Sequence, residues 1–208
     1  MNTAPATRPA IIPLTLISGF PKAGKSTLLD ALRTTQACAG ALILHRAGDT
    51  PRFFSDDPSL TLDVMSTPNG CLCCSGRGDW TRLLERLLRE RDNRRIAAFD
   101  RLLVETSGEA DPATMLAALS SHPYLSLRFA PAGILTVVDA ATVDETIAGC
   151  PEARRQVALA NWIVINPAHG PDSPGLRARL AMIAPAARLL TLQDAAGAYC
   201  AEYIAARS

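Results

Sequence analysis

A glycine-rich segment near the N-terminus has the residue types and spacing of a phosphate-binding loop. Residues 19–26 read Gly-Phe-Pro-Lys-Ala-Gly-Lys-Ser, which matches the pattern G-x-x-x-x-G-K-[ST]. In such a loop, backbone N–H groups surround phosphate oxygens at a helix end that favours anions. Lys25 is predicted to reach the β- and γ-phosphates, and the Ser26 hydroxyl to bind Mg²⁺. The residues predicted to contact the phosphates are Gly19, Lys22, Ala23, Gly24, Lys25, Ser26 and Thr27.

An acidic residue follows a continuous apolar run at 102–104, which is typical of a buried parallel strand. This residue, Glu105, is predicted to be the carboxylate partner of Mg²⁺, directly or through water. Gly108 is predicted to offer its N–H to the γ-phosphate and to shift when that phosphate leaves. Lys25, Glu105 and Gly108 are therefore the predicted catalytic residues. The alternative for Glu105 is a solvated strand end.

Three cysteines lie within four residues, at Cys71, Cys73 and Cys74. Thiolates of a C-x-C sequence can bind Zn²⁺, Cu⁺ or Co²⁺, although a turn is needed before all three converge. No partner C-x-x-C occurs elsewhere, so a closed structural zinc site is not expected. The candidates to complete the site are His45, Asp49, His169, water and a second subunit. The alternatives are buried small residues and redox thiols.

The elements that position these residues alternate along the chain. Leu14 to Ile17 is predicted to be a strand, and Lys25 to Thr35 a helix with leucines on one face. Asp79 is predicted to cap a helix over 79–91, Asp111 and Pro112 to begin another, and Ser173 a third. Further strands are predicted at 40–44, 60–65, 102–104, 134–138, 162–165 and 189–190, and further helices at 152–160 and 195–206. This order predicts the three-layer α/β fold of a P-loop NTPase, with a mostly parallel sheet and helices on both faces.

Length and composition set the broad class. The 208 residues carry a net charge of +1 and are 48% hydrophobic, which favours a globular protein without affinity for nucleic acid or membrane. We expect one domain over residues 1–208, with 1–12 as a flexible N-terminal arm, no signal peptide and a cytoplasmic location. The arginines of the helix at 79–91 alternate with acids, which favours a solvated face over a binding face.

Taken together, the three motifs resemble those of the CobW-like GTPases, the CobW/HypB/UreG group of nucleotide-binding domains. The family patterns G-F-L-G-A-G-K-T-T-L-L, G-C-x-C-C and E-T-[ST]-G-x-A-D-P stand here at 19–29, 70–74 and 105–112. The resemblance runs from about Leu14 to Ile165. It implies GTP-dependent delivery of zinc or cobalt to a metal-requiring target protein. It also implies that the nucleotide state controls the thiolate site, with Asn166 among the nucleotide-binding residues.

The chain differs from the family patterns at four places. The guanine-reading N-K-x-D is Asn166-Pro167-Ala168-His169, and imidazole cannot accept two hydrogen bonds as a carboxylate does. The switch stretch is His45-Arg46-Ala47-Gly48-Asp49 where the family has N-E-F-G-E. Lys22 replaces a loop glycine and would be strained at positive φ. We also expect no room for the family's usual C-terminal domain.

Two classes of function follow from these residues. The first is a nucleotide-dependent metallochaperone that hydrolyses GTP slowly, because no arginine finger is identifiable and a partner would have to activate it. The second is a non-hydrolysing regulatory module that binds nucleotide or metal. A small-molecule kinase would share the loop but leave the cysteines unexplained. The oligomeric state, including a homodimer, is left open.

Overall fold

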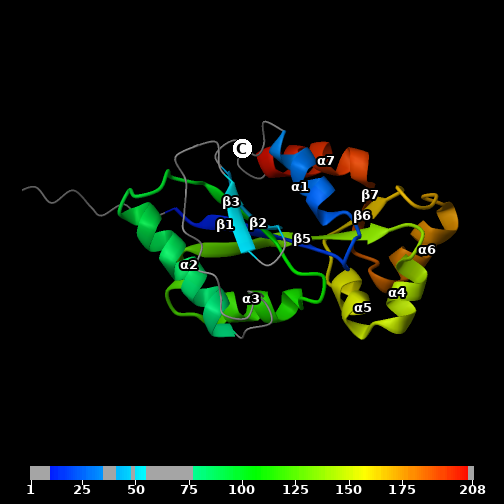
Figure 1. Ribbon diagram of the computed structural model, residues 1–208, viewed down its shortest axis with the longest axis horizontal. Helices are drawn as coiled ribbons and strands as arrows, with labels where there is room; N and C mark the ends of the chain where they lie inside the picture. Colours follow the sequence, from blue (N-terminus) through cyan, green and yellow to red (C-terminus); the bar gives the residue numbers. More distant parts are fainter. Residues whose placement is uncertain (1–9, 35–40, 48–49, 55–76, 206–208) are drawn as a thin grey trace, which may run out of the picture.

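One seven-stranded sheet forms the centre of the molecule (Figure 1). The computed structural model describes residues 10–34, 41–47, 50–54 and 77–205. The strand order is β3-β2-β4-β1-β5-β6-β7, in which β3 pairs antiparallel with β2 and every other pair is parallel. The strands are β1 (Ile12–Ser18), β2 (Ala41–Ala47), β3 (Thr50–Phe54), β4 (Arg101–Glu105), β5 (Phe129–Asp139), β6 (Trp162–Asn166) and β7 (Arg188–Thr191).

Helices cover both faces of this sheet. One face packs against α1 (Lys25–Arg33) and α7 (Leu192–Ala205). The other face packs against α2 (Arg77–Asp92), α3 (Pro112–Ser121), α5 (Pro151–Ala158) and α6 (Pro174–Ile183), with the short helices α4 (Val143–Gly149) and η2 (Leu125–Leu127) on the same side. The predicted three-layer α/β fold is confirmed.

The central strands are apolar without alternation because both of their faces are buried. On β1, Leu16 packs in the cluster under α2 and α3, and the next residue, Ile17, packs in the cluster under α1 and α7. Val137 and Val138 of β5 likewise point into opposite layers. Successive residues of a strand face opposite ways, so a strand covered on both sides needs an unbroken apolar run.

Most of the sequence predictions for helix starts hold. The Asp111 side chain accepts a hydrogen bond from Ala113 N at 3.0 Å, and Ser173 Oγ accepts one from Leu176 N at 3.2 Å. The predicted cap at Asp79 is wrong, because α2 already begins at Arg77 and places Asp79 inside the helix. The predicted strand at 60–65 lies outside the described residues. Neither β3 nor α4 was predicted.

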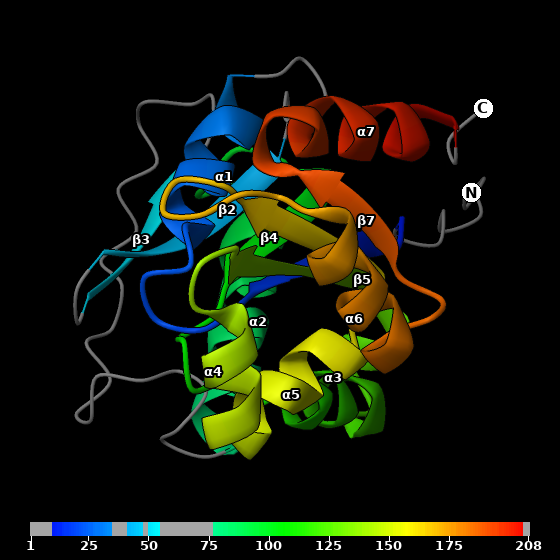
Figure 2. The ribbon, with the colours of Figure 1, turned by 90° about the vertical axis from the view of Figure 1, so that its right-hand side faces the viewer.

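Figure 2 views the side at which the parallel strands end. The β1–α1 loop, the ends of β4 and β5 and the loop after β6 all lie on this side. In parallel α/β sheets, ligands bind at this edge because helix N-termini and loops converge there. All predicted site residues within the described part of the chain therefore share one edge.

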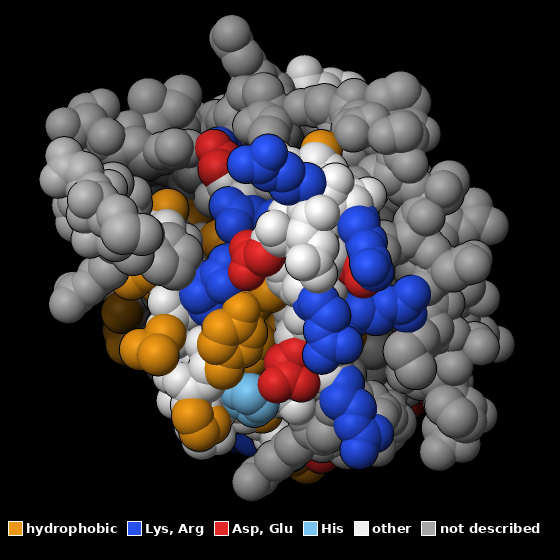
Figure 3. Space-filling view, turned by 90° about the vertical axis from the view of Figure 1, so that its left-hand side faces the viewer, with side chains coloured by type: hydrophobic (Ala, Val, Ile, Leu, Met, Phe, Trp, Pro, Cys, Tyr) orange, Lys and Arg blue, Asp and Glu red, His pale blue; other side chains and the backbone are white. Residues whose placement is uncertain are grey.

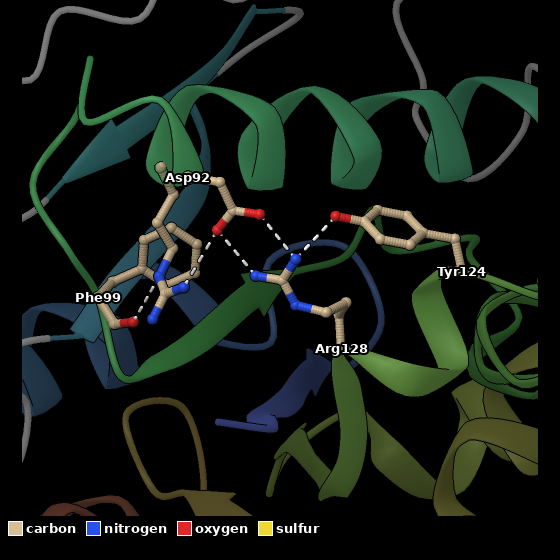
Figure 4. Close-up of polar contacts among 5 residues, drawn as sticks. Asp92, Phe99, Tyr124 and Arg128 are labelled. Atoms are coloured by element: carbon tan, nitrogen blue, oxygen red, sulfur yellow. Dashed lines mark hydrogen bonds and ion pairs between the residues drawn. The ribbon is translucent and has the colours of Figure 1, made fainter. Parts of the chain in front are cut away.

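The opposite side carries mixed charges (Figure 3). Arg128, which precedes β5, is held by Asp92 at the end of α2 through two hydrogen bonds of 2.7 and 2.8 Å. The Tyr124 hydroxyl accepts a third bond from the same guanidinium at 2.7 Å (Figure 4). Arg95 pairs with Glu90 at 3.4 Å. On this side, Arg128 and Arg95 are thus each paired with an acid of α2. None of the helices that the structure describes is both long and apolar enough to cross a bilayer.

Candidate functional site

The phosphate loop joins β1 to α1 and takes backbone conformations that glycine favours. Gly19 has a φ of 137° and Gly24, at the N-cap of α1, has a φ of 105°. A Cβ on Gly24 would lie 2.5 Å from Asn166 Nδ2, so no side chain fits there. Between them Lys22 has a φ of 66°, which confirms that the lysine occupies a position of positive φ. The loop therefore folds as the motif requires, with one strained residue.

Lys25 is the first residue of α1, and its side chain folds back into the loop. Its ammonium group donates to Gly19 O at 2.7 Å and to Phe20 O at 3.0 Å. Only 9% of the residue is exposed, so the charge is fixed close to the loop backbone. A buried cation held by neutral carbonyls beside a helix N-terminus is well placed to attract a phosphate.

Ser26 and Glu105 are brought together from 79 residues apart. Ser26 Oγ donates to Glu105 Oε1 at 3.1 Å, across the gap between α1 and the end of β4. Glu105 is 7% exposed, whereas Ser26 and its neighbour Thr27 are exposed. A hydroxyl and a carboxylate are oxygen ligands of the kind Mg²⁺ takes, so these two residues fit the ion at the mouth of the loop.

Gly108 lies directly against the loop. A Cβ at this position would come within 2.4 Å of Pro21 Cδ, so only glycine permits the approach. The Gln156 side chain of α5 donates through Nε2 to Gly108 O at 2.9 Å and to Ala110 O at 2.8 Å. Gly108 is thus held between the loop and a buried amide.

Asn166, at the end of β6, also binds the backbone of the phosphate loop. Its Nδ2 donates to Ala23 O at 3.0 Å, and its Oδ1 accepts from Ala168 N at 3.1 Å. The residue is 6% exposed. Both ends of the amide bind backbone, so the contacts of Asn166 fix the loop and the turn that follows β6.

His169 takes the position at which the family pattern has an aspartate, and it binds an acid at the end of the neighbouring strand β5. His169 Nδ1 lies 2.5 Å from Asp139 Oδ2, and Ala141 N donates to Asp139 Oδ1 at 2.8 Å. Burial raises the pKa of the Asp139 carboxyl, but the hydrogen bonds from His169 and from Ala141 outweigh burial, so the pKa lies below its usual range. An ionised carboxylate only accepts, so Nδ1 carries the proton and Nε2 remains for other contacts.

The predicted cysteine site lies outside the described residues, as Cys71, Cys73 and Cys74 fall in 55–76. Asp49, named as a candidate to complete it, also lies outside them. In the described part of the chain, no group of three His, Cys, Asp or Glu side chains could hold a metal ion. Cys150 is a free cysteine and is half-buried.

Sequence reasoning missed Gln156 as a contact of the site and did not connect Asp139 with His169. Gln156 is 1% exposed and shares the buried face of α5 with Ala153 and Val157. A glutamine at spacing i, i+3, i+4 among buried small residues is the signal that could have found it. Asp139 ends a buried strand, as Glu105 does, and the same rule could have found it.

Comparisons with known proteins agree with this geometry. A family model described as "CobW/HypB/UreG, nucleotide-binding domain" matches residues 13–178. The chain is 34% identical over 159 residues to Zinc chaperone YjiA of Escherichia coli (strain K12), an alignment covering 74% of this chain and 48% of YjiA. It is 33% identical over 150 residues to Zinc chaperone CobW of Sinorhizobium sp, covering 69% of this chain and 40% of that protein.

Solved structures share this fold. The crystal structure of Zn(II)-bound YjiA GTPase from E. coli superposes with a TM-score of 0.67 at 28% identity, covering 88% of this chain and 57% of that one. The chain spans about half the length of the curated relatives it matches. The family match covers well over half of the chain, and it includes the phosphate loop, Glu105 and Asn166. The chain belongs to the CobW/HypB/UreG family, through its nucleotide-binding domain.

Proposed function

We propose that this chain is a nucleotide-dependent metal chaperone that binds GTP with Mg²⁺ and hydrolyses it slowly. The observation that carries the proposal is the pairing of Ser26 with Glu105 at 3.1 Å beside an intact phosphate loop. The similarity to proteins named zinc chaperones supports a metal cargo. Zinc or cobalt would be handed to a metal-requiring target protein in the cytoplasm, and the working form would be a monomer or a homodimer.

Each residue of the loop has a distinct task in this proposal. Lys25 neutralises charge on the β- and γ-phosphates once it exchanges the carbonyls of Gly19 and Phe20 for phosphate oxygens. The N–H groups at the start of α1, from Gly24 to Thr27, bind the phosphate oxygens. Ser26 and Glu105 would hold Mg²⁺, which neutralises phosphate charge when it is bound.

The Gly108 N–H would bind the γ-phosphate and would lose this partner when the phosphate leaves. Its contact with Pro21 and its hydrogen bond from Gln156 place its backbone between the loop and α5. A backbone N–H that binds the γ-phosphate loses its partner on hydrolysis, so the segment after β4 can move. Motion there is the step by which hydrolysis would reach the thiolates of Cys71, Cys73 and Cys74.

The experiment measures phosphate release from GTP with Mg²⁺, in the presence and absence of Zn²⁺ or Co²⁺. Lys25→Ala is expected to lower the rate at least about a hundredfold, because it removes a positioned cation of the kind that stabilises transition-state charge. Arg33→Ala, at the far end of the same helix, is the matched control and should keep the rate. A wild-type protein that binds GTP but releases no phosphate would refute hydrolysis and leave the regulatory module.

A second measurement tests the cargo site. Changing Cys71 and Cys73 to Ser is expected to lower the zinc bound per chain, since thiolates are the preferred ligands. Cys150→Ser is the control, because this half-buried thiol lies apart from the cluster in the sequence. Equal zinc content in the cluster variant and in the control would remove the cargo proposal while leaving nucleotide binding intact.

The non-hydrolysing module remains the second candidate because of one observation. His169 binds Asp139 instead of presenting a carboxylate at the base-reading position. A single imidazole nitrogen accepts one hydrogen bond, so guanine selection by two bonds is lost there. Competition among GTP, ATP and XTP measures the base preference, and phosphate release from the bound nucleotide separates the two candidates.

A further inference from the structure

The segment that follows β4 forms a turn whose two ends are fixed. Thr106 N donates to Ile17 O of β1 at 2.9 Å, which holds the start of the segment against the sheet. Ala110 N donates to Ser107 O at 3.1 Å and closes a turn over residues 107–110, and α3 begins shortly after it. The middle of this turn therefore depends on contacts from other elements.

The side chain of Gln156 on α5 supplies those contacts. Its Nε2 donates to Gly108 O at 2.9 Å and to Ala110 O at 2.8 Å, so both hydrogens of the amide bind carbonyls of the turn. The backbone carbonyl of Gln156 accepts a hydrogen bond from Thr136 Oγ1 of β5 at 2.8 Å. Gln156 and Thr136 are both buried. The residue is thus fixed to the sheet through its backbone and holds the turn through its side chain.

The turn keeps two backbone donors while two of its acceptors are occupied. Among the described residues, none accepts a hydrogen bond from the N–H of Gly108 or of Glu109. Pro21 fills the space that a Cβ on Gly108 would need, so this part of the turn lies against the phosphate loop. Successive backbone N–H groups in a turn can bind an anion. By binding the carbonyls, Gln156 keeps oxygen atoms that would repel a phosphate engaged elsewhere.

The place of this turn determines which nucleotide it affects. A nucleoside triphosphate and its diphosphate share the α- and β-phosphates and differ in the γ-phosphate alone. The N–H groups at the start of α1 bind phosphates that both nucleotides carry. In the proposed function, Gly108 meets the γ-phosphate only. A residue that acts through Gly108 therefore changes the affinity for the triphosphate and leaves the affinity for the diphosphate.

We infer that Gln156 is a positioning residue that sets the preference of the site for a nucleoside triphosphate over a diphosphate. Both hydrogens of its amide are engaged with the turn, so it acts by holding Gly108 and not by touching the nucleotide. This role rests on the proposed function, because the turn selects a triphosphate only if a γ-phosphate reaches Gly108.

Gln156→Met removes the amide and nearly keeps the length of the side chain. The experiment measures, with Mg²⁺ and the full chain, the Kd of the imido analogue of the triphosphate that binds best and the Kd of the corresponding diphosphate. Gln156→Met is expected to bind the triphosphate analogue about tenfold more weakly, because the turn is no longer held. The Kd of the diphosphate should stay within about twofold, since the loop that binds it is unchanged.

A second variant guards against a failure to fold. If circular dichroism shows that Gln156→Met is unfolded, Gln156→Asn takes its place. The asparagine side chain keeps the amide but is one methylene shorter, so it cannot reach both carbonyls of the turn. The same loss of preference for the triphosphate is expected of it.

Thr15→Val is the matched control. Thr15 Oγ1 lies 2.9 Å from the Tyr199 hydroxyl in a buried contact between β1 and α7, so this variant also loses a buried hydrogen bond, but away from the turn. It should lower the free energy of unfolding and leave both nucleotide affinities unchanged. If the role of Gln156 were only to stabilise the fold, Gln156→Met would behave in the same way as this control.

Hydrogen exchange in the absence of nucleotide tests the hold on the turn directly. The Ala110 N–H is bonded within the turn, whereas the Thr106 N–H is bonded to β1. In Gln156→Met the Ala110 amide should exchange at least about fivefold faster relative to the Thr106 amide, because the turn can open without breaking the two bonds to Gln156. In Thr15→Val this ratio of rates should stay as in the wild type.

Three outcomes would overturn the role of Gln156 while the proposed function stands. These are an unchanged preference for the triphosphate in Gln156→Met, an equal loss of affinity for both nucleotides, and an unchanged exchange rate at Ala110. A wild type that binds neither nucleotide would overturn the proposed function and the preference together. Faster exchange at Ala110 would then still show that Gln156 holds the turn, so the two failures are distinguishable.

Discussion

Lys22 sits in the phosphate loop at a φ of 66°, in the left-handed region that costs a side chain about 1–2 kcal/mol. Lys22→Gly removes this strain, but it also gives the unfolded chain more conformational freedom, which lowers the free energy of unfolding by about 0.5–1 kcal/mol. The free energy of unfolding is therefore expected to rise by about 0.5 kcal/mol, measured by urea denaturation. Nucleotide affinity should fall at the same time, because the ammonium charge beside the phosphates is lost.

Lys22→Arg is the control for Lys22→Gly. It keeps both the charge and the strained backbone, so neither the stability nor the affinity should change much. A lower stability in Lys22→Gly would contradict the strain at this position. An unchanged nucleotide affinity in that variant would show that the charge points away from the phosphates.

His169 lowers the pKa of Asp139 by a hydrogen bond, against the effect of burial. In His169→Ala the pKa of the Asp139 carboxyl should therefore rise, as followed by a ¹³C NMR titration of its carboxyl signal. The stability should change by less than about 1 kcal/mol, because the His169 side chain is 67% exposed. His122→Ala, which removes a contact with Glu85, is the control. The same Asp139 pKa in both variants would contradict the pair.

Between elements, the contact with the clearest consequence joins the end of α2 to the start of β5. The Arg128 side chain is 7% exposed, and its positive charge is balanced by the carboxylate of Asp92, whose side chain is 41% exposed. Asp92→Asn should cost about 2 kcal/mol, less than a fully buried pair because solvent screens the carboxylate. Chemical denaturation at pH 7 measures it. Asp30→Asn, in a pair exposed on both sides, should cost less than about 0.5 kcal/mol.

The same pair predicts a pH dependence. The hydrogen bond from Arg128 holds the pKa of Asp92 below its usual value of 3.8. A group with a lowered folded pKa stabilises the fold above its unfolded pKa, and this stabilisation is lost as the pH falls through the folded pKa. The stability difference between the wild type and Asp92→Asn should thus be full at pH 7 and shrink below about pH 4. A difference that is the same at pH 3 would contradict this.

How well an element could be predicted depended on how strongly burial had shaped its sequence. The central strands, α5 and α7 were predicted from their residue patterns, and the structure places each within a few residues of the prediction, whereas the start of α6 was predicted from its cap at Ser173. The edge strand β3 left no such pattern in the sequence. Within the described residues it pairs on one side only, and it contains Pro51. The short helix α4 buries one residue, Val143, and has no apolar stripe to detect. The Asp79 cap was wrong because the apolar pattern does not mark the first turn.

At the scale of the whole molecule, the predicted nucleotide-site residues of the described part of the chain meet because the ends of the parallel strands meet at one edge of the sheet. Lys25 and Ser26 were predictable from a local motif, and Glu105 from its place after a buried strand. The hydrogen bonds of Gln156 to Gly108 and of His169 to Asp139 were not, since they span 48 and 30 residues and depend on how helices and loops pack. Sequence spacing fixes what is local, and the fold adds these bridging contacts.

Ligand binding should be visible in the stability of the entire chain. A ligand that binds only the folded state adds about 2.7 kcal/mol at a concentration of 100 times its Kd. For a chain of 208 residues this corresponds to a rise in Tm of about 8 °C. We expect this rise with GTP and Mg²⁺ by differential scanning fluorimetry. Lys25→Ala should abolish most of it, whereas Arg33→Ala should keep it, because Arg33 ends the helix that Lys25 begins. A wild-type Tm that ignores GTP and Mg²⁺ would show that the loop, Ser26 and Glu105 are assembled without forming a working nucleotide site.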